Sequence, residues 1–547
     1  MKTHLLALGA LFAATAASAD TIVDNFNGYQ VDKEGRIRTF NGLLVGDDGR
    51  VKIVLTPGAR RPGPVDRIID MGGKTLLPGL IDAHGHVIGL GFGALQLDLT
   101  GTASLAELQQ RLKDYAAANP EARWIVGRGW NQELWPDQRF PTAADLDAVV
   151  NDRPVVLTRV DGHALVANSA AMRTAGVTAA TEAPSGGRIE NGLFVDNAMS
   201  LIESKVPAPT GGEADAALAK AQDILLGYGL TAVADMGTSA DGWRAMTRAG
   251  DAGRLNVRIM SYASALPALE ALGRTAPTDW LYGDRLRMGG VKLYADGALG
   301  SRGAWLKRAY ADKPDSVGLR FLGDAELREQ AGKAAGMGFQ LAIHAIGDAA
   351  NAQVISLFEQ LGNGDRRSRI EHVQVVDPAD IPRIAKAGII ASMQPTHQTS
   401  DRLMAEKRLD PPRLEGAYAW HTIAQSGARL AFGSDFPVES PNPFPGLAAA
   451  ISRQDMNGQP PGGWRPEERV SLAQALDGFT RSAAFAGFAE DRIGSLEPGK
   501  WADFIIVDRD PTKVDAQALA RTQVLETWVA GKKVWARAAD AGSERGK

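Results

Sequence analysis

Four histidines and one aspartate stand where short apolar segments end, and side chains of these types can bind a metal. His84 and His86 are two residues apart, where an apolar run ends in glycine. Because residues two apart in a strand face the same side, both imidazoles can reach one point. His344 and His372 each end another apolar run, and Asp435 follows a third. Imidazole and carboxylate donors suit a divalent metal such as zinc, so the sequence predicts a metal site.

The middle of the chain must supply the elements that position these residues. It contains strand-like apolar runs at residues 231–235, 290–294, 340–344, 369–373, 389–393 and 429–433. Helical patterns fall between them, for example at 324–336 and 379–387. This alternation predicts βαβ units and a parallel α/β sheet, open or closed. Polar residues end several runs, as a barrel with its site at the carboxyl ends of the strands would require.

Both ends of the chain carry β-strand patterns separated by turn signals. We therefore expect one small β-domain built from residues 20–78 and 490–547, with the barrel over residues 79–489. The segment between His84 and the run at 290–294 is longer than two or three βα units should need. This excess length predicts an insertion at about residues 100–212.

The first 19 residues have the form of a secretory signal peptide. Lys2 provides the positive start, residues 5–17 are apolar, and Ala17-Ser18-Ala19 offers a cleavage site before Asp20. The expected location is the periplasm or outside the cell, and the alternative is an uncleaved anchor. No other stretch approaches ~18 apolar, uncharged residues, so we expect no membrane span.

Composition narrows the classes of function further. At 44% hydrophobic and 23% charged residues, the 547-residue chain is in the range of globular proteins. The net charge of −4 gives no basic surface for nucleic acid. The absence of cysteine excludes disulfides, thiolate metal sites and cysteine nucleophiles. The expected partner is a small-molecule substrate, and the oligomeric state stays open, with a homodimer as one option.

Several motifs together resemble the amidohydrolase superfamily. Residues 78–86 read Pro-Gly-Leu-Ile-Asp-Ala-His-Gly-His, which matches the signature of the first barrel strand in that superfamily. Residues 291–302, 344–348, 371–372 and 433–437 look like the family 3 branch, which includes N-substituted formamide deformylases. The resemblance covers about residues 20–534. It implies a metal-bearing (β/α)8 barrel, a composite β-sandwich domain and an insertion after the first barrel strand.

The resemblance also implies a binuclear centre with two divalent metal ions, expected to be zinc. Its ligands would be His84, His86, Lys292, His344, His372 and Asp435. Asp435 would in addition serve as the catalytic acid and base. Lys292 occupies the place of a lysine that CO2 carboxylates in related enzymes. Burial lowers the pKa of a lysine, and carboxylation turns a repelling cation into an anion that two metals can share.

The expected reaction is hydrolysis of a carbon–nitrogen bond in an amide or N-acyl compound. The alternatives are an esterase, lactonase or phosphotriesterase on the same site, and a non-catalytic binding or regulatory relative. A mononuclear deaminase is less favoured, because the residues after His344 lack the His-x-x-Glu pattern of that relative.

Three further residues are predicted to contact substrate, each with a structural alternative. His163 follows an Asp-Gly pair similar to one in the branch, and a structural turn is the alternative. Arg302, in a glycine-flanked loop, could hold an anionic or carbonyl group, or lie free on the surface. Trp130 could line the pocket, and packing in a hydrophobic core is the alternative. His397 is expected near the mouth of the site but not as a ligand.

Overall fold

The computed structural model describes residues 20–538 apart from 160–163, 179, 185–186 and 363. Its centre is a sheet of eight parallel strands. In sheet order these strands are β6 (Leu80–Gly85), β13 (Leu230–Thr238), β14 (Arg258–Ser264), β15 (Leu286–Tyr294), β16 (Gln340–Ala345), β17 (Arg369–His372), β18 (Ile390–Met393) and β19 (Arg429–Phe432). Each strand-like run predicted in the middle of the chain overlaps one of these strands.

The sheet closes into a barrel just beyond the ends of β19 and β6. Gly85 forms a parallel bridge with Phe436, and the amide of Asp435 donates to the carbonyl oxygen of His84 at 2.7 Å. A β-carbon at Gly85 would lie 2.2 Å from the Phe436 ring, so this approach requires glycine. The predicted (β/α)8 fold is confirmed.

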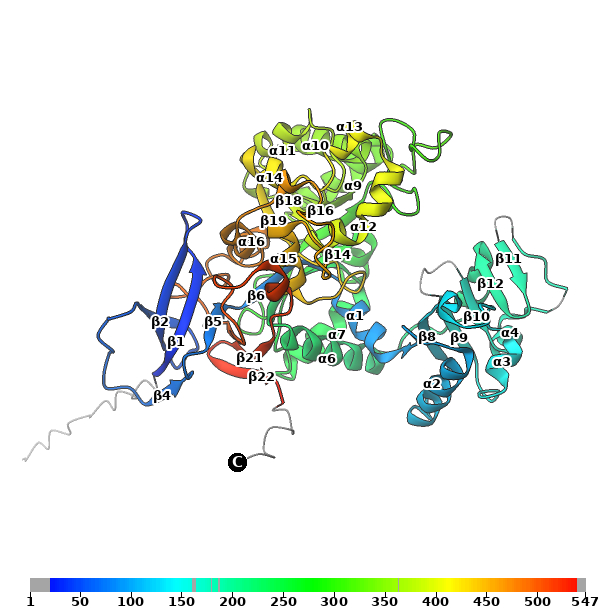
Figure 1. The fold of residues 1–547 in the computed structure, drawn as a ribbon, viewed down its shortest axis with the longest axis horizontal. Coiled ribbons are helices and arrows are strands. Elements are labelled where there is room, and N and C mark those ends of the chain that lie inside the picture. The colour runs from blue at the N-terminus through cyan, green and yellow to red at the C-terminus, as the bar shows by residue number, and fades with distance from the viewer. Residues whose placement is uncertain (1–19, 160–163, 179, 185–186, 363, 539–547) are drawn as a thin grey trace, which may run out of the picture.

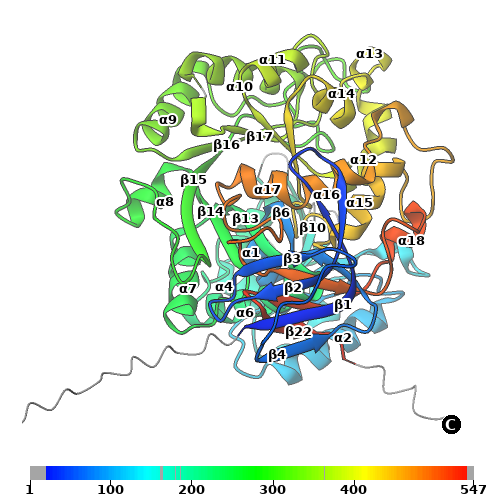
Figure 2. The ribbon, with the colours of Figure 1, turned by 90° about the vertical axis from the view of Figure 1, so that its left-hand side faces the viewer.

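Helices surround the barrel (Figure 2). The helices that follow or accompany the barrel strands are α1 (Val87–Leu95), α6 (Gly211–Gly227), α7 (Ala240–Asp251), α8 (Ala265–Ala271), α9 (Asp324–Gly336), α10 (Asp348–Leu361), α11 (Ile381–Lys386), α12 (Pro395–Arg408), α13 (Pro411–Leu414), α14 (Trp420–Gln425), α15 (Pro443–Ser452), α16 (Leu472–Gly478) and α17 (Arg481–Ala486). Inward-facing residues of the strands, such as Ile81 and Ala342, pack with Ala483 and Ala484 of α17. This packing fills the interior of the barrel on the side of α17, so a functional site is expected at the carboxyl ends of the strands.

Both chain ends contribute to a second sheet, as the sequence predicted. Its order is β22 (Lys532–Ala536), β21 (Val524–Val529), β20 (Phe504–Val507), β5 (Thr75–Pro78), β1 (Thr21–Val31), β2 (Ile37–Val45) and β3 (Val51–Leu55), with β4 (Arg67–Asp70) also paired to β1. A register shift between Asp24 and Gly28 lets β1 pair with β4 along its first half and with β5 along its second. Phe40, Phe504 and Trp528, from opposite ends of the chain, share one core.

A third sheet forms the insertion between α1 and α6. It runs β11 (Gly187–Glu190), β12 (Leu193–Asp196), β10 (Ala164–Ala167), β9 (Val155–Arg159), β8 (Ile125–Trp130) and β7 (Leu97–Asp98), accompanied by α2 (Leu105–Ala118), α3 (Ala143–Asp147), α4 (Ser169–Ala175) and α5 (Ser200–Glu203). Figure 1 shows it as a lobe beside the barrel. Leu108 and Leu112 of α2 pack with Trp130 and Val155 of the sheet, so the insertion has its own core.

The last short helix, α18 (Ala516–Ala520), packs against α15. Among the described residues, no helix has both the length and the apolar character that crossing a membrane requires.

Candidate metal centre

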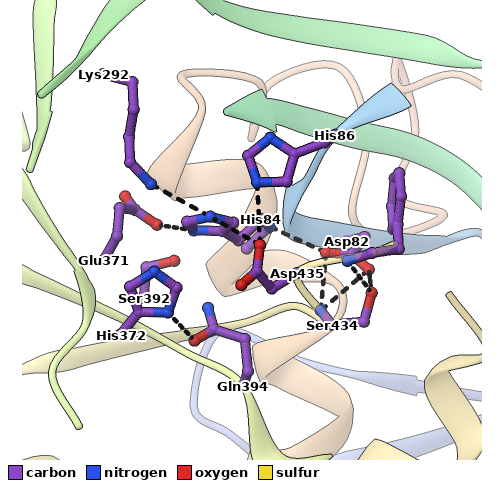
Figure 3. Close-up of polar contacts among 12 residues, drawn as sticks. Asp82, His84, His86, Lys292, Glu371, His372, Ser392, Gln394, Ser434 and Asp435 are labelled. Atoms are coloured by element: carbon purple, nitrogen blue, oxygen red, sulfur yellow. Dashed lines mark hydrogen bonds and ion pairs between the residues drawn. The ribbon is translucent and has the colours of Figure 1, made fainter. Parts of the chain in front are cut away.

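The barrel brings the six predicted ligands to the carboxyl ends of its strands, and Figure 3 labels all of them except His344. They come from β6, β15, β16, β17 and the segment after β19, in the order His84 and His86, Lys292, His344, His372 and Asp435. All six line one cavity of about 390 Å³. The structure therefore brings together residues that are as much as 351 positions apart in the chain.

One half of the centre is built around the Asp435 carboxylate. Its Oδ1 atom lies 3.0 Å from Nε2 of His86 and 3.4 Å from Nε2 of His84. Nζ of Lys292 lies 3.3 Å from the same His84 nitrogen. Burial acts to raise the pKa of Asp435, but the adjacent His84 imidazole and the hydrogen bond to His86 hold this pKa well below its usual value. Asp435 is therefore a carboxylate at neutral pH, ready to bind a cation.

The other half is formed by the two histidines of β16 and β17. The His344 and His372 ring centres are 4.6 Å apart, and His372 lies 4.8 Å from His84. Burial is the main reason that the pKa values of His84 and His372 are well below the ordinary value for histidine. Both imidazoles are therefore neutral, which is the form that binds metals.

Hydrogen bonds on the far side of two rings fix which nitrogen faces the centre. Oε2 of Glu371 lies 2.6 Å from Nδ1 of His84, and Oε1 of Gln394 lies 2.8 Å from Nδ1 of His372. These partners hold the Nδ1 atoms, so the Nε2 atoms are directed at the centre. Such partners orient ligands and increase their basicity.

Glu371 is in turn held by a buried arginine that sequence reasoning did not identify. Arg369 donates to Glu371 at 2.5 Å, to the carbonyl oxygen of Ala83 at 2.6 Å and to Ser392 at 2.7 Å. Arg369 and Glu371 are both 0% exposed. The only signal in the sequence was two charged residues, two positions apart, in an otherwise apolar strand that ends in a ligand.

The backbone at two ligands adopts a conformation that most residues avoid. His372 has a φ of +79° and Asp435 a φ of +62°. Left-handed backbone at non-glycine residues costs roughly 1–3 kcal/mol and is concentrated at functional sites. The closing hydrogen bond from the Asp435 amide helps to hold this geometry.

The donor set fits a divalent metal. His344 lines the cavity from β16, and its buried Nε2 atom makes no hydrogen bond within the described part of the chain but lies 3.4 Å from Oδ1 of Asp296. His84, His86 and Asp435 place one donor atom each within 4.8 Å of one another, as do His372, His397 and Asp435. Imidazole nitrogen and carboxylate oxygen atoms are among the ligands that zinc prefers.

His397 was expected near the mouth, and the structure places it against the predicted ligands. Its ring stacks on His372 with 5.9 Å between centroids, and its Nε2 atom lies 3.8 Å from Oδ2 of Asp435. It begins α12, directly after β18. Its position after another strand end was the same signal that identified the other histidines.

Two of the three predicted substrate contacts, Trp130 and Arg302, do not line this cavity. Trp130 is 0% exposed in the core of the insertion, where its indole N–H donates to the carbonyl oxygen of Leu157. Arg302 forms an ion pair with Asp312 at 2.9 Å and does not line the cavity. The geometry of this cavity therefore gives no support for a substrate contact by either residue. His163 lies outside the described residues.

A closed α/β barrel with imidazole, lysine and carboxylate donors at the carboxyl ends of its strands is the arrangement of a metal-dependent hydrolase. A model of the amidohydrolase family matches residues 67–535, and this chain belongs to that family. The resemblance seen in the sequence motifs is confirmed.

Three relatives illustrate the range of the family. Protein LONG AFTER FAR-RED 3 of Arabidopsis thaliana is 34% identical over 85% of this chain and 83% of its own. The N-substituted formamide deformylase of Arthrobacter pascens is 28% identical over 94% of this chain and 97% of its own. A crystal structure of an uncharacterized metal-dependent hydrolase from Pyrococcus horikoshii OT3 has a TM-score of 0.78 and 29% identity, covering 91% of this chain and 99% of that one.

Proposed function

We propose that this protein hydrolyses the carbon–nitrogen bond of an amide or N-acyl compound with two divalent metal ions, zinc being the expected metal. The observation that supports this most is the convergence of six donor side chains on one cavity. The relative from Arthrobacter pascens is named for a formamide, which supports an amide substrate.

His84, His86 and Asp435 would hold one ion, and His344 and His372 the other, with Lys292 between them. A bound zinc ion lowers the pKa of a water molecule from ~15.7 to ~7 and polarises a carbonyl group. The protein's own contribution is proton transfer. We assign the Asp435 carboxylate to accept the proton of the attacking water and to deliver it to the departing amine nitrogen.

Lys292 is suited to carboxylation by CO2. Its side chain is 1% exposed, and burial lowers its pKa to about 8. At pH 7 about one lysine in ten is then neutral, against about one in 10³ for an ordinary lysine. The neutral amine nitrogen bonds to the carbon of CO2 and releases one proton, which leaves a carbamate anion. That anion would offer two oxygen atoms where the free amine offers a positive charge.

Metal content and activity together test this function. We expect about two zinc ions per chain, loss of activity with a chelator, and recovery when zinc is returned. A panel of formamides, N-acyl amines, esters, lactones and phosphotriesters then identifies the bond, and amides should be cleaved fastest. A fully metal-loaded protein that cleaves none of them would favour a binding or regulatory role instead.

We also propose that the protein is exported. The support is the sequence of residues 1–19, which lie outside the described part of the structure. Sequencing the amino terminus of the protein isolated from its native cell should find a chain that begins at Asp20. A mature chain that begins at Met1 would contradict export by cleavage.

A further inference from the structure

The outer part of the cavity has an apolar side that can hold a short hydrocarbon chain. Beyond the donor residues it is lined by Tyr294, Leu299, Ile346, Met404 and Val438. Tyr294 is 38% exposed and Val438 71% exposed, so this surface is open to an incoming molecule. Apolar contacts of this kind favour a substrate with methylene groups next to the bond that is cleaved.

Two carboxylates lie at the rim of the same cavity. Asp401 is on α12, and Glu439 follows β19. The hydroxyl of Ser400, the neighbour of Asp401, donates to Glu439 at 2.6 Å, so the two acids belong to the same part of the rim. Asp401 accepts hydrogen bonds from the Tyr418 hydroxyl at 2.9 Å and the amide of Gln374 at 3.1 Å.

The hydrogen-bond donors to these two carboxylates are neutral groups, and the neighbouring His397 acts to lower the pKa of Asp401. No ion pair to a lysine or arginine is formed by Asp401 or Glu439 within the described ranges of the chain. Burial raises the pKa of Asp401, because removal of water disfavours its charge. A positively charged group of a ligand next to Asp401 would favour the charged form of this carboxylate, which burial disfavours.

Within the described ranges, the outer part of the cavity has no lysine or arginine that could pair with an anionic group of a substrate. Of the lysines and arginines that the structure describes, only Lys292 lines the cavity, and Lys292 lies at the base among the metal donors. Arg302, the arginine that sequence reasoning placed in the pocket, is paired with Asp312. His397 adds a buried Nε2 atom that faces the cavity and makes no hydrogen bond to any described residue.

We propose that the substrate is an N-acylated diamine, in which a short apolar chain joins the amide nitrogen to a free ammonium group. This inference rests on the proposed amide hydrolysis and adds the chemistry of the leaving group. The acyl carbonyl would lie at the metal donors, the chain along the apolar side, and the ammonium between Asp401 and Glu439. N-acyl amino acids would be disfavoured, because their carboxylate would face these two acids.

Three matched compounds test the charge preference. N-acetyl-1,4-diaminobutane, N-butylacetamide and 4-acetamidobutanoate share the acetamide and a four-carbon chain and differ in terminal charge. We expect kcat/KM to fall about tenfold from the cationic to the neutral compound and further for the anionic one, which corresponds to ~1.4 kcal/mol per step. Raised salt should narrow the differences.

A pair of variants assigns the preference to the rim. Glu439→Gln should reduce both kcat/KM for the cationic compound and the cationic-to-neutral ratio of kcat/KM several-fold, because glutamine carries no charge to pair with the ammonium group. Glu415→Gln, at an exposed acid that does not line the cavity, is the matched control and should change neither value. The rate on the neutral compound shows at the same time that the variant is folded.

The outcomes separate this inference from the proposed function. Cleavage of the anionic compound as fast as the cationic one overturns the charge preference and leaves amide hydrolysis standing. If none of the three is cleaved, amide hydrolysis fails for this class, and calorimetric binding of the same compounds to the zinc-loaded protein decides the preference. Tighter binding of the cationic compound than of the neutral and anionic compounds then supports the charge preference, and equal or weaker binding refutes it.

Discussion

Replacing Glu371 by glutamine should weaken metal binding and destabilise the protein at once. The Glu371 side chain joins two buried partners: Nδ1 of His84 at 2.6 Å and the guanidinium of Arg369 at 2.5 Å. Glutamine keeps the shape of the side chain but removes its charge. His84 then loses the carboxylate that orients it, and Arg369 becomes a buried cation without its compensating anion.

Each consequence has a size that follows from the geometry. Removing one partner of a fully buried ion pair destabilises a protein by about 3–5 kcal/mol, because the remaining charge is desolvated and unpaired. Removing the hydrogen-bond partner of a metal-binding histidine lowers metal affinity about 10–100-fold. Both effects are expected here, since Arg369 and Glu371 are 0% exposed.

A second buried ion pair provides the control. Arg258 of β14 and Asp503 of the terminal sheet are 1% and 4% exposed, with Nε and Oδ2 2.6 Å apart, and neither lines the metal cavity. Asp503→Asn should therefore cause a similar loss of stability with unchanged zinc affinity. Urea unfolding of the metal-free proteins measures the stability, and competition with a chelator measures the zinc affinity.

Two results would refute this reasoning. Unchanged zinc affinity in Glu371→Gln would show that this carboxylate does not orient His84. A loss of zinc affinity in Asp503→Asn as large as that in Glu371→Gln would show that the effect follows general destabilisation and not the contact with the ligand.

Three further predictions concern the centre and the insertion. Asp435→Asn should abolish hydrolysis and retain much of the bound zinc, measured by turnover and elemental analysis, and normal turnover would disprove its role in proton transfer. Lys292→Ala should reduce zinc below two ions per chain, and full occupancy would exclude a bridging carbamate. The hydrogen bond from Arg139 lowers the pKa of Asp145 to about 2, although partial burial acts to raise it. The charged Asp145 side chain therefore stabilises the start of α3 at pH values above its ordinary pKa of 3.8, and this stabilisation is lost as the pH falls towards 2. The stability difference between the native protein and Asp145→Asn should shrink over that range in urea unfolding, and a difference that grows towards pH 2 would contradict the assignment.

Much of the fold could be predicted because its signals are local. The predicted barrel strands are apolar runs between turn or helix signals, and the predicted helix at 324–336 coincides with α9, whereas β14 was not predicted. The donors could be found because polar side chains at strand ends meet at one edge of a parallel sheet. Trp130 and Arg302 could not be placed this way. Their roles depend on a separate hydrophobic core and on an ion pair with Asp312, neither of which has a local pattern.

The amino-acid sequence by itself determined the order of the strands, the residue types of the metal donors and the family. These properties follow from short-range periodicity and from motifs of a few residues. The tertiary structure decided which polar side chains face the centre, that Arg369 compensates Glu371, and that Asp401 and Glu439 share one rim. The reason is that closing the barrel joins β6 to the segment after β19, and such contacts between distant segments arise only when all eight strands pack together.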